Sequence, residues 1–193
     1  MLNSLVSRMF TGSRGAPAAG LPAVPETDRE RQFALLASLA RSTYGRTFEP
    51  RCGDGELTAL LARRCAQVVA TDERREQVLL ARRRCALLGN VHVSLAELAQ
   101  GPPPGRYDLM VLNDVGFECS PMALSQMASR LAAYLQPAGE LIAVHGLDPA
   151  PGSRLHGDAI HCLLGANLPL EWTGGSRFAE FRIDRWERLG RMA

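Results

Sequence analysis

The sequence contains no lysine, and all 22 of its basic residues are arginine. A P-loop needs a lysine on the nucleotide phosphates, and Schiff-base enzymes need a lysine amine, so both classes are excluded. Apolar runs of about 18 residues are also missing, so we expect no membrane-spanning helix. Arg8 interrupts the apolar stretch at 5–10, which argues against a secretory signal.

Paired cysteines are absent as well. The five cysteines, at 52, 65, 85, 119 and 162, are odd in number and scattered, with no C-x-x-C pair. This pattern argues against a disulfide framework or a zinc site and indicates a reducing, cytoplasmic environment. Long basic runs are missing too, and the net charge is only +2. We therefore expect no nucleic-acid groove; the arginines at 82–84 form a solvated helix face more readily than a phosphate site.

The composition that remains is that of a globular domain. A chain of 193 residues with 46% hydrophobic content can bury one full core. Residues 1–25 are rich in glycine, proline and alanine after position 10, which predicts a flexible leader. Residues 26–193 are then a single domain.

Helical and buried-strand patterns alternate along that domain. Helices are predicted at 27–41, 55–64, 74–88, 121–135 and 157–165, and strands at 47–49, 67–71, 91–95, 107–112 and 140–145. Residues 171–173 and 178–186, separated by two glycines, are typical of a hairpin. The alternation predicts an α/β fold with a doubly wound, mostly parallel sheet that ends in an antiparallel hairpin.

The most informative segment is the first strand–turn–helix–strand unit, residues 47–72. An acid, Glu49, precedes a glycine turn that ends at Gly55, and a second acid, Asp72, ends the next strand. This is half of a nucleotide-type βαβ unit, in which an acid about 20 residues beyond the turn binds a ribose diol. Asp72 is also placed to cap the following helix, and both roles remain open.

The same turn lacks the third glycine of a dinucleotide site. Three acids, Glu49, Asp54 and Glu56, surround the start of the helix, where a pyrophosphate would be repelled. S-adenosylmethionine has no phosphate and carries a cationic sulfonium, so it tolerates this acidic environment. The turn therefore favours S-adenosylmethionine over a nicotinamide-dependent oxidoreductase.

Several further segments form one set with this turn. They are YGR at 44–46, FEPRC at 48–52, VLNDVG at 111–116, LIAVH at 141–145, GDAIH at 157–161 and FRIDRW at 181–186. Together they resemble the NodS-like type of class I methyltransferase, the family of the nodulation N-methyltransferase, over roughly residues 28–188.

The resemblance implies a Rossmann-like, seven-stranded sheet in the order 3-2-1-4-5-7-6, with strand seven antiparallel. S-adenosylmethionine would lie across the carboxyl ends of strands one, two and four. The positions that match the family are Glu49, Cys52 and Gly53 for the methionine moiety, Asp72 for the ribose, Glu97 with the Leu98 amide for the adenine, Asn113 beneath the sulfonium and Asp114 facing the acceptor.

Arg51 departs from the family, which has glycine there. An arginine with left-handed backbone costs about 1–2 kcal/mol, and its side chain would enter the methionine end of the pocket. Either Arg51 points outward or pairs with the ligand carboxylate, which leaves an active enzyme, or it fills the pocket and abolishes cofactor binding.

Two residues at strand ends are candidates for proton transfer. Asp114 ends the most apolar strand and would be costly to bury unpaired. His145 ends the strand at 140–145, where either a general base or a backbone-bonded core histidine is expected. Asp158 and His161 lie three residues apart on a predicted helix, a spacing that favours local pairing or capping over metal binding. No metal site is expected.

These features predict a cytoplasmic S-adenosylmethionine-dependent N- or O-methyltransferase that acts on a small amino or hydroxyl acceptor, with an amino sugar as the acceptor that the resemblance suggests. A protein partner or a homodimer remains open. The alternative is a non-catalytic, methyltransferase-like binding or assembly partner. Arg51 favours this alternative, and so do residues 146–148, where the family often carries Trp-Arg-His; Glu49, Asp72 and Asp114 oppose it.

Overall fold

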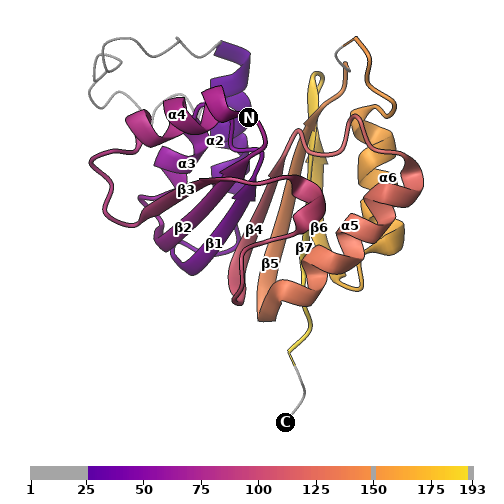
Figure 1. The fold of residues 1–193 in the computed structure, drawn as a ribbon. Coiled ribbons are helices and arrows are strands. Elements are labelled where there is room, and N and C mark those ends of the chain that lie inside the picture. The colour runs from indigo at the N-terminus through magenta and orange to yellow at the C-terminus, as the bar shows by residue number, and fades with distance from the viewer. Residues whose placement is uncertain (1–25, 149–150, 191–193) are drawn as a thin grey trace, which may run out of the picture.

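The structure is a computed structural model that describes residues 26–148 and 151–190; the leader expected at 1–25 lies outside them. Seven strands form one sheet in the order β3-β2-β1-β4-β5-β7-β6 (Figure 1). Their bounds are β1 Tyr44–Pro50, β2 Cys65–Asp72, β3 Val91–Leu95, β4 Tyr107–Asn113, β5 Leu135–Gly146, β6 Glu171–Arg177 and β7 Phe181–Glu187. Strands β1 to β5 pair in parallel, and β7 pairs antiparallel with β5 and β6. The expected strand order and hairpin are confirmed.

Helices cover both faces of the sheet. Helices α2 Glu26–Ser38, α3 Glu56–Leu61 and α4 Arg75–Arg84 lie on one side in Figure 1, and α5 Pro121–Tyr134 and α6 Gly157–Asn167 on the other. A short 3-10 helix, η1 Leu98–Gln100, connects β3 toward β4. Each face therefore has its own apolar core. Among the described residues, none of the helices is long and apolar enough to cross a membrane.

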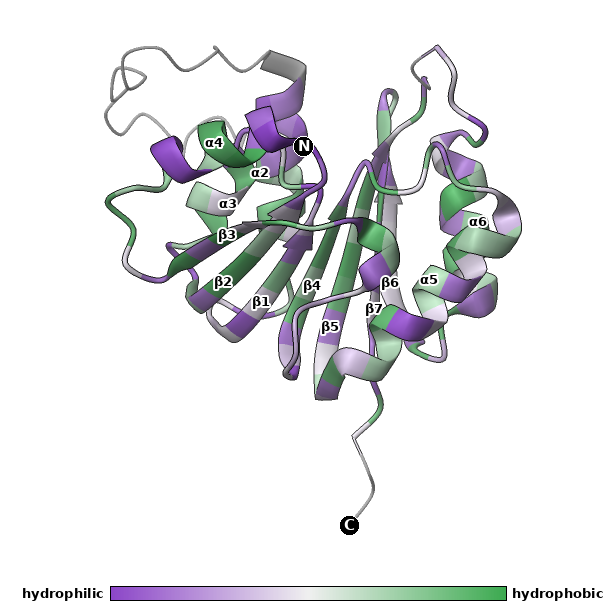
Figure 2. Ribbon diagram, viewed as in Figure 1, coloured by the Kyte–Doolittle hydropathy of each residue, from purple (hydrophilic) through white to green (hydrophobic). Residues whose placement is uncertain are grey.

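The central strands are apolar on both faces because helices cover each side. In β4, Leu109, Met110, Val111 and Leu112 are all 0% exposed, with odd and even positions in different cores. Figure 2 shows this as green colouring concentrated on the inner strands. The buried ladder gives β4 and β5 a rigid frame, and their carboxyl ends carry the site.

Several element bounds differ from the sequence-based expectations. Strand β1 begins at Tyr44 rather than 47, because its ladder with β2 extends back to Cys65. Helix α4 ends at Arg84, four residues early, where the chain turns through Cys85. The expected turn at 137–139 lies within β5, where Ala138 and Gly139 exchange backbone hydrogen bonds with Arg188. Likewise, the two glycines at 174–175 lie within β6, and the chain reverses after Arg177 instead.

The arginine cluster at 82–84 is only partly a solvated face. Arg82 Nε donates to the Val93 carbonyl at 3.0 Å, and Arg84 pairs with Asp54 at 2.5 Å. Arg83 is exposed. Two of the three side chains thus fix α4 to β3 and to the glycine turn.

A buried acid anchors the end of α2 to the sheet. Glu140 on β5 is 3% exposed; it accepts a hydrogen bond from Tyr44 Oη at 2.5 Å and from the Ala40 amide at 3.3 Å. Burial and the hydrogen bond to Glu140 raise the pKa of Tyr44, so its hydroxyl remains a donor at all ordinary pH values. This contact holds the segment that connects α2 to β1 against strand β5.

We expect Tyr44→Phe to destabilise the fold by about 1–3 kcal/mol, because the Glu140 carboxylate then loses a buried donor. Urea denaturation of the variant and the wild type measures the difference. Tyr134→Phe is the matched control, since the structure gives the Tyr134 hydroxyl no hydrogen bond among the described residues, and its effect should be within about 0.5 kcal/mol. Equal effects of the two substitutions would show that the Tyr44–Glu140 contact stabilises nothing.

Candidate functional site

The turn after β1 is tied to the end of β2. The Cys52 amide donates to the Thr71 carbonyl at 2.9 Å, and the Gly53 amide donates to Asp72 Oδ2 at 3.0 Å. Arg51 and Gly53 both have left-handed backbone, with φ of 54° and 57°. Two strand ends are thereby joined at the edge of the sheet where ligands bind in open α/β folds.

Gly55 permits the close approach of two helices beneath this turn. Its φ is 83°, and a Cβ added there would lie 2.8 Å from the Cα of Ala81 on α4. Any other residue would force α3 and α4 apart. The glycine that the sequence pattern singles out is therefore required for packing as well as for the turn.

Glu49 is buried behind the turn rather than exposed to it. It is 1% exposed and accepts a hydrogen bond from Thr58 Oγ1 at 2.6 Å, which links β1 to α3. Burial raises the pKa of Glu49 to about 8, although the Thr58 hydrogen bond acts in the opposite direction. The carboxyl is therefore largely protonated at neutral pH.

The acid cluster expected around the helix start is largely neutralised. Arg84 of α4 pairs with Asp54 at 2.5 Å and lies 3.9 Å from Glu56. With Glu49 protonated, the turn carries less free negative charge than its composition indicates. The local sequence around the turn does not indicate this pairing, because Arg84 lies 30 residues beyond Asp54.

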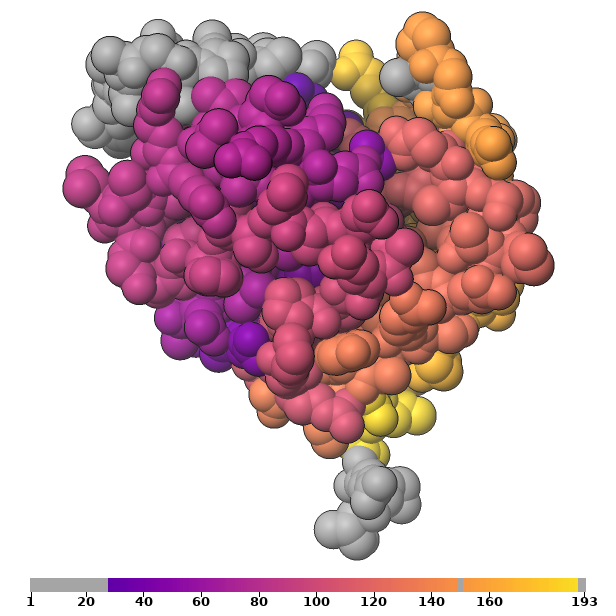
Figure 3. Space-filling view, in the orientation of Figure 1, coloured from indigo at the N-terminus to yellow at the C-terminus, as the bar shows by residue number. Residues whose placement is uncertain are grey.

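A cavity of about 420 Å³ lies beside the turn. Its walls come from the segments that follow β1, β2, β3 and β4 and from α5, so it lies at the carboxyl ends of four parallel strands. Figure 3 shows this face of the molecule, hollowed where the η1 segment meets α5. The lining includes the polar Arg51, Glu73, Glu97 and Glu118 and the apolar Leu98, Ala99, Met127 and Leu131. Mixed walls of this kind are typical of small-molecule sites.

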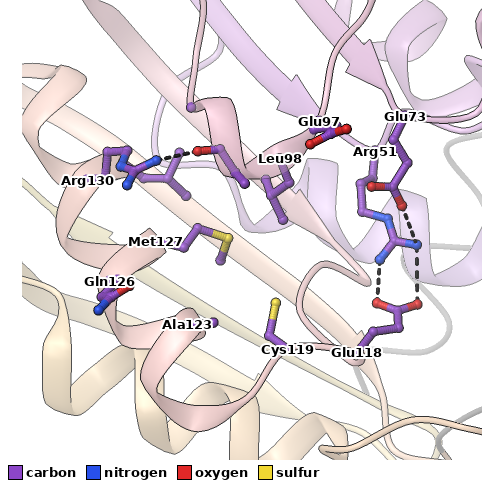
Figure 4. Close-up of a pocket in the computed structure, with 13 residues that line it drawn as sticks. Arg51, Glu73, Glu97, Leu98, Glu118, Cys119, Ala123, Gln126, Met127 and Arg130 are labelled. Atoms are coloured by element: carbon purple, nitrogen blue, oxygen red, sulfur yellow. Dashed lines mark hydrogen bonds and ion pairs between the residues drawn. The ribbon is translucent and has the colours of Figure 1, made fainter.

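Arg51 spans the mouth of this cavity. Its guanidinium donates to Glu118 through Nη1 at 2.6 Å and Nη2 at 3.3 Å, and Nη2 lies 3.6 Å from Glu73 (Figure 4). Glu73 follows β2 and Glu118 follows β4, so one side chain from the end of β1 joins three strand ends. We call this set the Arg51 bridge. Hydrogen bonding from Arg51 lowers the pKa of Glu118, which keeps the pair charged.

The Arg51 bridge can open at modest cost. Glu118 is 61% exposed, and ion pairs with such exposure contribute about 0.2–1 kcal/mol. A ligand with moderate affinity is therefore able to displace the bridge.

Asp72, expected on the ribose, is fully used by the protein. Its Oδ2 accepts from Gly53, and Oδ1 accepts from the Arg74 amide at 2.9 Å and from Arg74 Nε at 3.3 Å. Its side chain is 0% exposed, whereas that of the adjacent Glu73 is 42% exposed and lines the cavity. In this arrangement Glu73 is the acid at the end of β2 that a ligand can reach.

Of the other expected cofactor residues, two line the cavity and two are not among its lining residues. Glu97 and Leu98 both line the cavity, next to η1. Cys52 is 7% exposed, and burial raises the pKa of its thiol, so it is no nucleophile. Asn113 ends β4 with a buried Oδ1 that has no hydrogen-bond partner among the described residues. That oxygen is a free acceptor for a bound molecule.

Asp114, expected to face the acceptor, follows β4 with left-handed backbone, at φ of 52°. Its Oδ2 pairs with Arg31 Nη1 of α2 at 2.6 Å, and its Oδ1 accepts from the Gly146 amide at 3.0 Å. The carboxylate is 33% exposed. Arg31 thus joins α2 to the ends of β4 and β5.

His145 is completely buried. Its Nε2 is 2.9 Å from the Val115 carbonyl, and its Nδ1 is 3.1 Å from His161 Nε2. Burial lowers the pKa of His145 to about 3. Both ring nitrogens are occupied, so this arrangement favours the backbone-bonded core histidine over the general base. Asp158 and His161, expected to pair locally, bond other residues: Asp158 contacts Arg177 and Arg182, and His161 contacts Asp184.

Sequence reasoning missed Glu73, Glu118 and Arg31. Arg51 at a glycine position was the one feature that could have indicated Glu73 and Glu118, because a cation where strand ends converge is expected to pair with acids from the neighbouring strand ends. Glu118 is 67 residues away, so only the expected sheet order could have pointed to it. No group of three or more metal-ligating side chains occurs in the part of the chain that the structure describes.

The residues beside the cavity fit a nucleoside better than a phosphate. Carboxylates of Glu73 and Glu97 suit ribose hydroxyls and an adenine amino group as hydrogen-bond acceptors, and Leu98 and Met127 provide apolar contact for a flat base.

Comparisons with known proteins agree with this geometry. The methyltransferase domain family matches residues 49–139. A Pseudomonas syringae protein whose crystal structure carries a provisional methyltransferase assignment is 32% identical, with 84% of this chain and 99% of that chain covered and a TM-score of 0.72. The N-methyltransferase NodS from Bradyrhizobium japonicum WM9, in complex with S-adenosyl-L-homocysteine, is 17% identical, with 96% and 97% covered and a TM-score of 0.75. No curated protein sequence matches the chain. The methyltransferase family match and the two structural matches give no support to the non-catalytic alternative.

The raised pKa of Glu49 predicts a pH-dependent stability. A folded-state pKa of about 8 exceeds the ordinary 4.5, so the stability that Glu49 contributes is fully present below about pH 4.5 and is lost as the pH rises toward 8. Between about pH 5.5 and about pH 7.5, the wild type should lose about 1–3 kcal/mol more stability than Glu49→Gln, which keeps an acceptor for Thr58. Urea denaturation at both pH values measures this.

Glu97→Gln, an exposed acid on the same edge, is the control and should follow the wild type. If Glu49→Gln has the same pH dependence as the wild type, Glu49 ionises normally in the fold, and its buried, neutral state is disproved.

Proposed function

Because the chain belongs to the class I S-adenosylmethionine-dependent methyltransferase family, we propose that it transfers a methyl group from S-adenosylmethionine to a small acceptor. The observation that carries the proposal is the mixed acidic and apolar cavity at the carboxyl ends of β1 to β4. An amine is the favoured acceptor group, since the B. japonicum relative is an N-methyltransferase. A hydroxyl acceptor and an amino-sugar scaffold remain within the proposal.

The cavity residues hold the donor from both ends. Glu97 and Leu98 would contact the adenine, and Glu73 the ribose, with Asp72 fixing the Gly53 turn against which the rest of the molecule lies. Asn113 supplies the free carbonyl oxygen beneath the reacting centre. Glu49 lies behind the turn in this proposal, where its hydrogen bond from Thr58 holds α3 against β1.

When bound, S-adenosylmethionine supplies a methyl group activated by its positive sulfur. The protein contributes orientation, which is the larger part of such catalysis, because the two reactants must be in line. Asp114 is the residue that faces the acceptor; Arg31 and the Gly146 amide bond its oxygens and orient the carboxylate toward a cationic or proton-bearing acceptor group. His145, with both nitrogens occupied, receives no proton-transfer role in this proposal.

The Arg51 bridge makes donor binding weaker than an open cleft would allow. Glu118→Gln removes the charge that holds Arg51 across the mouth, and Arg51→Gly removes the side chain itself. Opening the bridge costs about 1 kcal/mol, so each variant should bind S-adenosyl-L-homocysteine about fivefold more tightly than the wild type, or better for Arg51→Gly. Isothermal titration calorimetry measures the three affinities.

Glu180→Gln is the matched control, an exposed acid in the β6–β7 connection with no ion pair among the described residues, and should leave the affinity unchanged. The methyltransferase proposal fails if neither the wild type nor either variant binds the nucleoside. If the nucleoside binds all four proteins equally, the function stands but the bridge does not obstruct the cleft.

A further inference from the structure

A buried chain of hydrogen bonds joins β7, α6, β5 and the loop after β4. Asp184 Oδ2 lies 2.7 Å from His161 Nδ1, His161 Nε2 lies 3.1 Å from His145 Nδ1, and His145 Nε2 lies 2.9 Å from the Val115 carbonyl. His145 is 0% exposed, His161 1% and Asp184 3%, so water is not available to satisfy these atoms. We call this set the histidine relay.

The hydrogen bonds of the histidine relay determine how many protons it carries and therefore its charge. The Val115 carbonyl is an acceptor only, so His145 Nε2 must carry a proton. The contact between the two rings needs one proton, because two nitrogen lone pairs at 3.1 Å would repel. Asp184 also accepts from Arg182 Nε at 2.7 Å and from Trp172 Nε1 at 3.0 Å, so it is a carboxylate and His161 Nδ1 donates to it. Two neutral rings have only two ring protons, and the three contacts require three.

The charges around the relay agree with a third proton on His161. Burial alone would raise the pKa of Asp184, but hydrogen bonds from His161 and Trp172 and the charges of His161 and Arg182 lower it, so an anion is present beside His161. Arg182 is the nearby cation that opposes the extra proton, and Asp158 pairs with it at 3.4 Å. Arg177 pairs with Asp158 in turn. Arg31 of α2, whose partner is Asp114, is a second cation, and its charge contributes to the lowered pKa of His145.

We propose that His145 and His161 share three ring protons, and that this singly positive pair, balanced by Asp184, acts as a positioning device for the segment that carries Asp114. Val115 is 0% exposed and directly follows Asp114, whose backbone is left-handed. Gly146 directly follows His145 and donates to Asp114 Oδ1 at 3.0 Å. His145 is therefore bonded to the residue on one side of Asp114 and adjacent to the residue that binds its carboxylate.

In this role the two histidines bind no metal and act as neither a nucleophile nor a general base. Phe117 packs edge-on against His145, with ring centroids 5.6 Å apart, so the relay supports the whole loop from Asp114 to Phe117. Loss of the third proton leaves one of three buried contacts without a hydrogen bond. The loop would then lose the hydrogen bond from His145 Nε2 to the Val115 carbonyl, or His145 would lose the contact with His161 that keeps its proton on Nε2.

Ring ¹⁵N resonances of histidine-labelled protein test the proton count directly. The sequence has four histidines, and the other two, His92 and His156, are exposed and serve as internal references. At neutral pH, we expect His161 to show two protonated nitrogens and His145 to show a proton on Nε2 only. Two neutral buried rings, or a proton on His145 Nδ1 with none on Nε2, would overturn the proposal. This measurement uses the wild-type chain and needs no substrate or cofactor.

Asp184→Asn tests the link from the relay to Asp114. Asparagine can still accept from His161 but cannot balance its charge, so His161 should become neutral. The Asp114 amide, which donates to the Val144 carbonyl at 2.9 Å, should then exchange with solvent about fivefold faster, because one supporting hydrogen bond is worth about 1 kcal/mol. Asp158→Asn is the matched control: it alters a neighbouring carboxylate that bonds Arg182 but not His161, and should change neither readout.

An Asp184→Asn protein that keeps all three ring protons, or that loses one without faster Asp114 exchange, would refute the positioning role. If Asp184→Asn does not fold, the wild-type ring resonances decide alone. None of these outcomes depends on methyl transfer, so their failure leaves the proposed function to its own calorimetric test.

Discussion

The site depends on one constraint: a cation emerges from the point where three parallel strands end. Arg51 has left-handed backbone at the end of β1, and its guanidinium pairs with Glu73 and Glu118, which follow the neighbouring strands. The resulting bridge stabilises the unliganded cleft and at the same time crosses it. Because its pairing energy is small, the bridge is a weak closure that a ligand can displace.

Three acids at this edge of the sheet are satisfied within the protein, each in a different way. Glu49 is buried and keeps its proton, Asp72 accepts backbone amides, and Asp54 pairs with Arg84. Glu73 and Glu97 remain accessible on the cavity wall. The cavity wall therefore presents these two carboxylates as hydrogen-bond acceptors, while the other three acids are satisfied within the protein.

The fold could be predicted from the sequence to a large extent, since buried strands alternate with helices and the motif set implied the strand order. The turn at Gly53 and Gly55 was likewise predictable, because its residues are local. Side-chain partnerships were not. Asp72 and Glu73 are neighbours in sequence, yet one faces the protein and the other the cavity. The relay from Asp184 to His145 connects residues on three elements, and only the folded arrangement reveals that the rings face each other.

The most direct measurement is a crystal structure of the wild-type protein with S-adenosyl-L-homocysteine. We predict that the nucleoside occupies the cavity between η1 and α5, with the Arg51 guanidinium separated from Glu118. A structure in which the nucleoside lies elsewhere, or occupies the cleft while the Arg51–Glu118 pair stays intact across it, would contradict this account of the site.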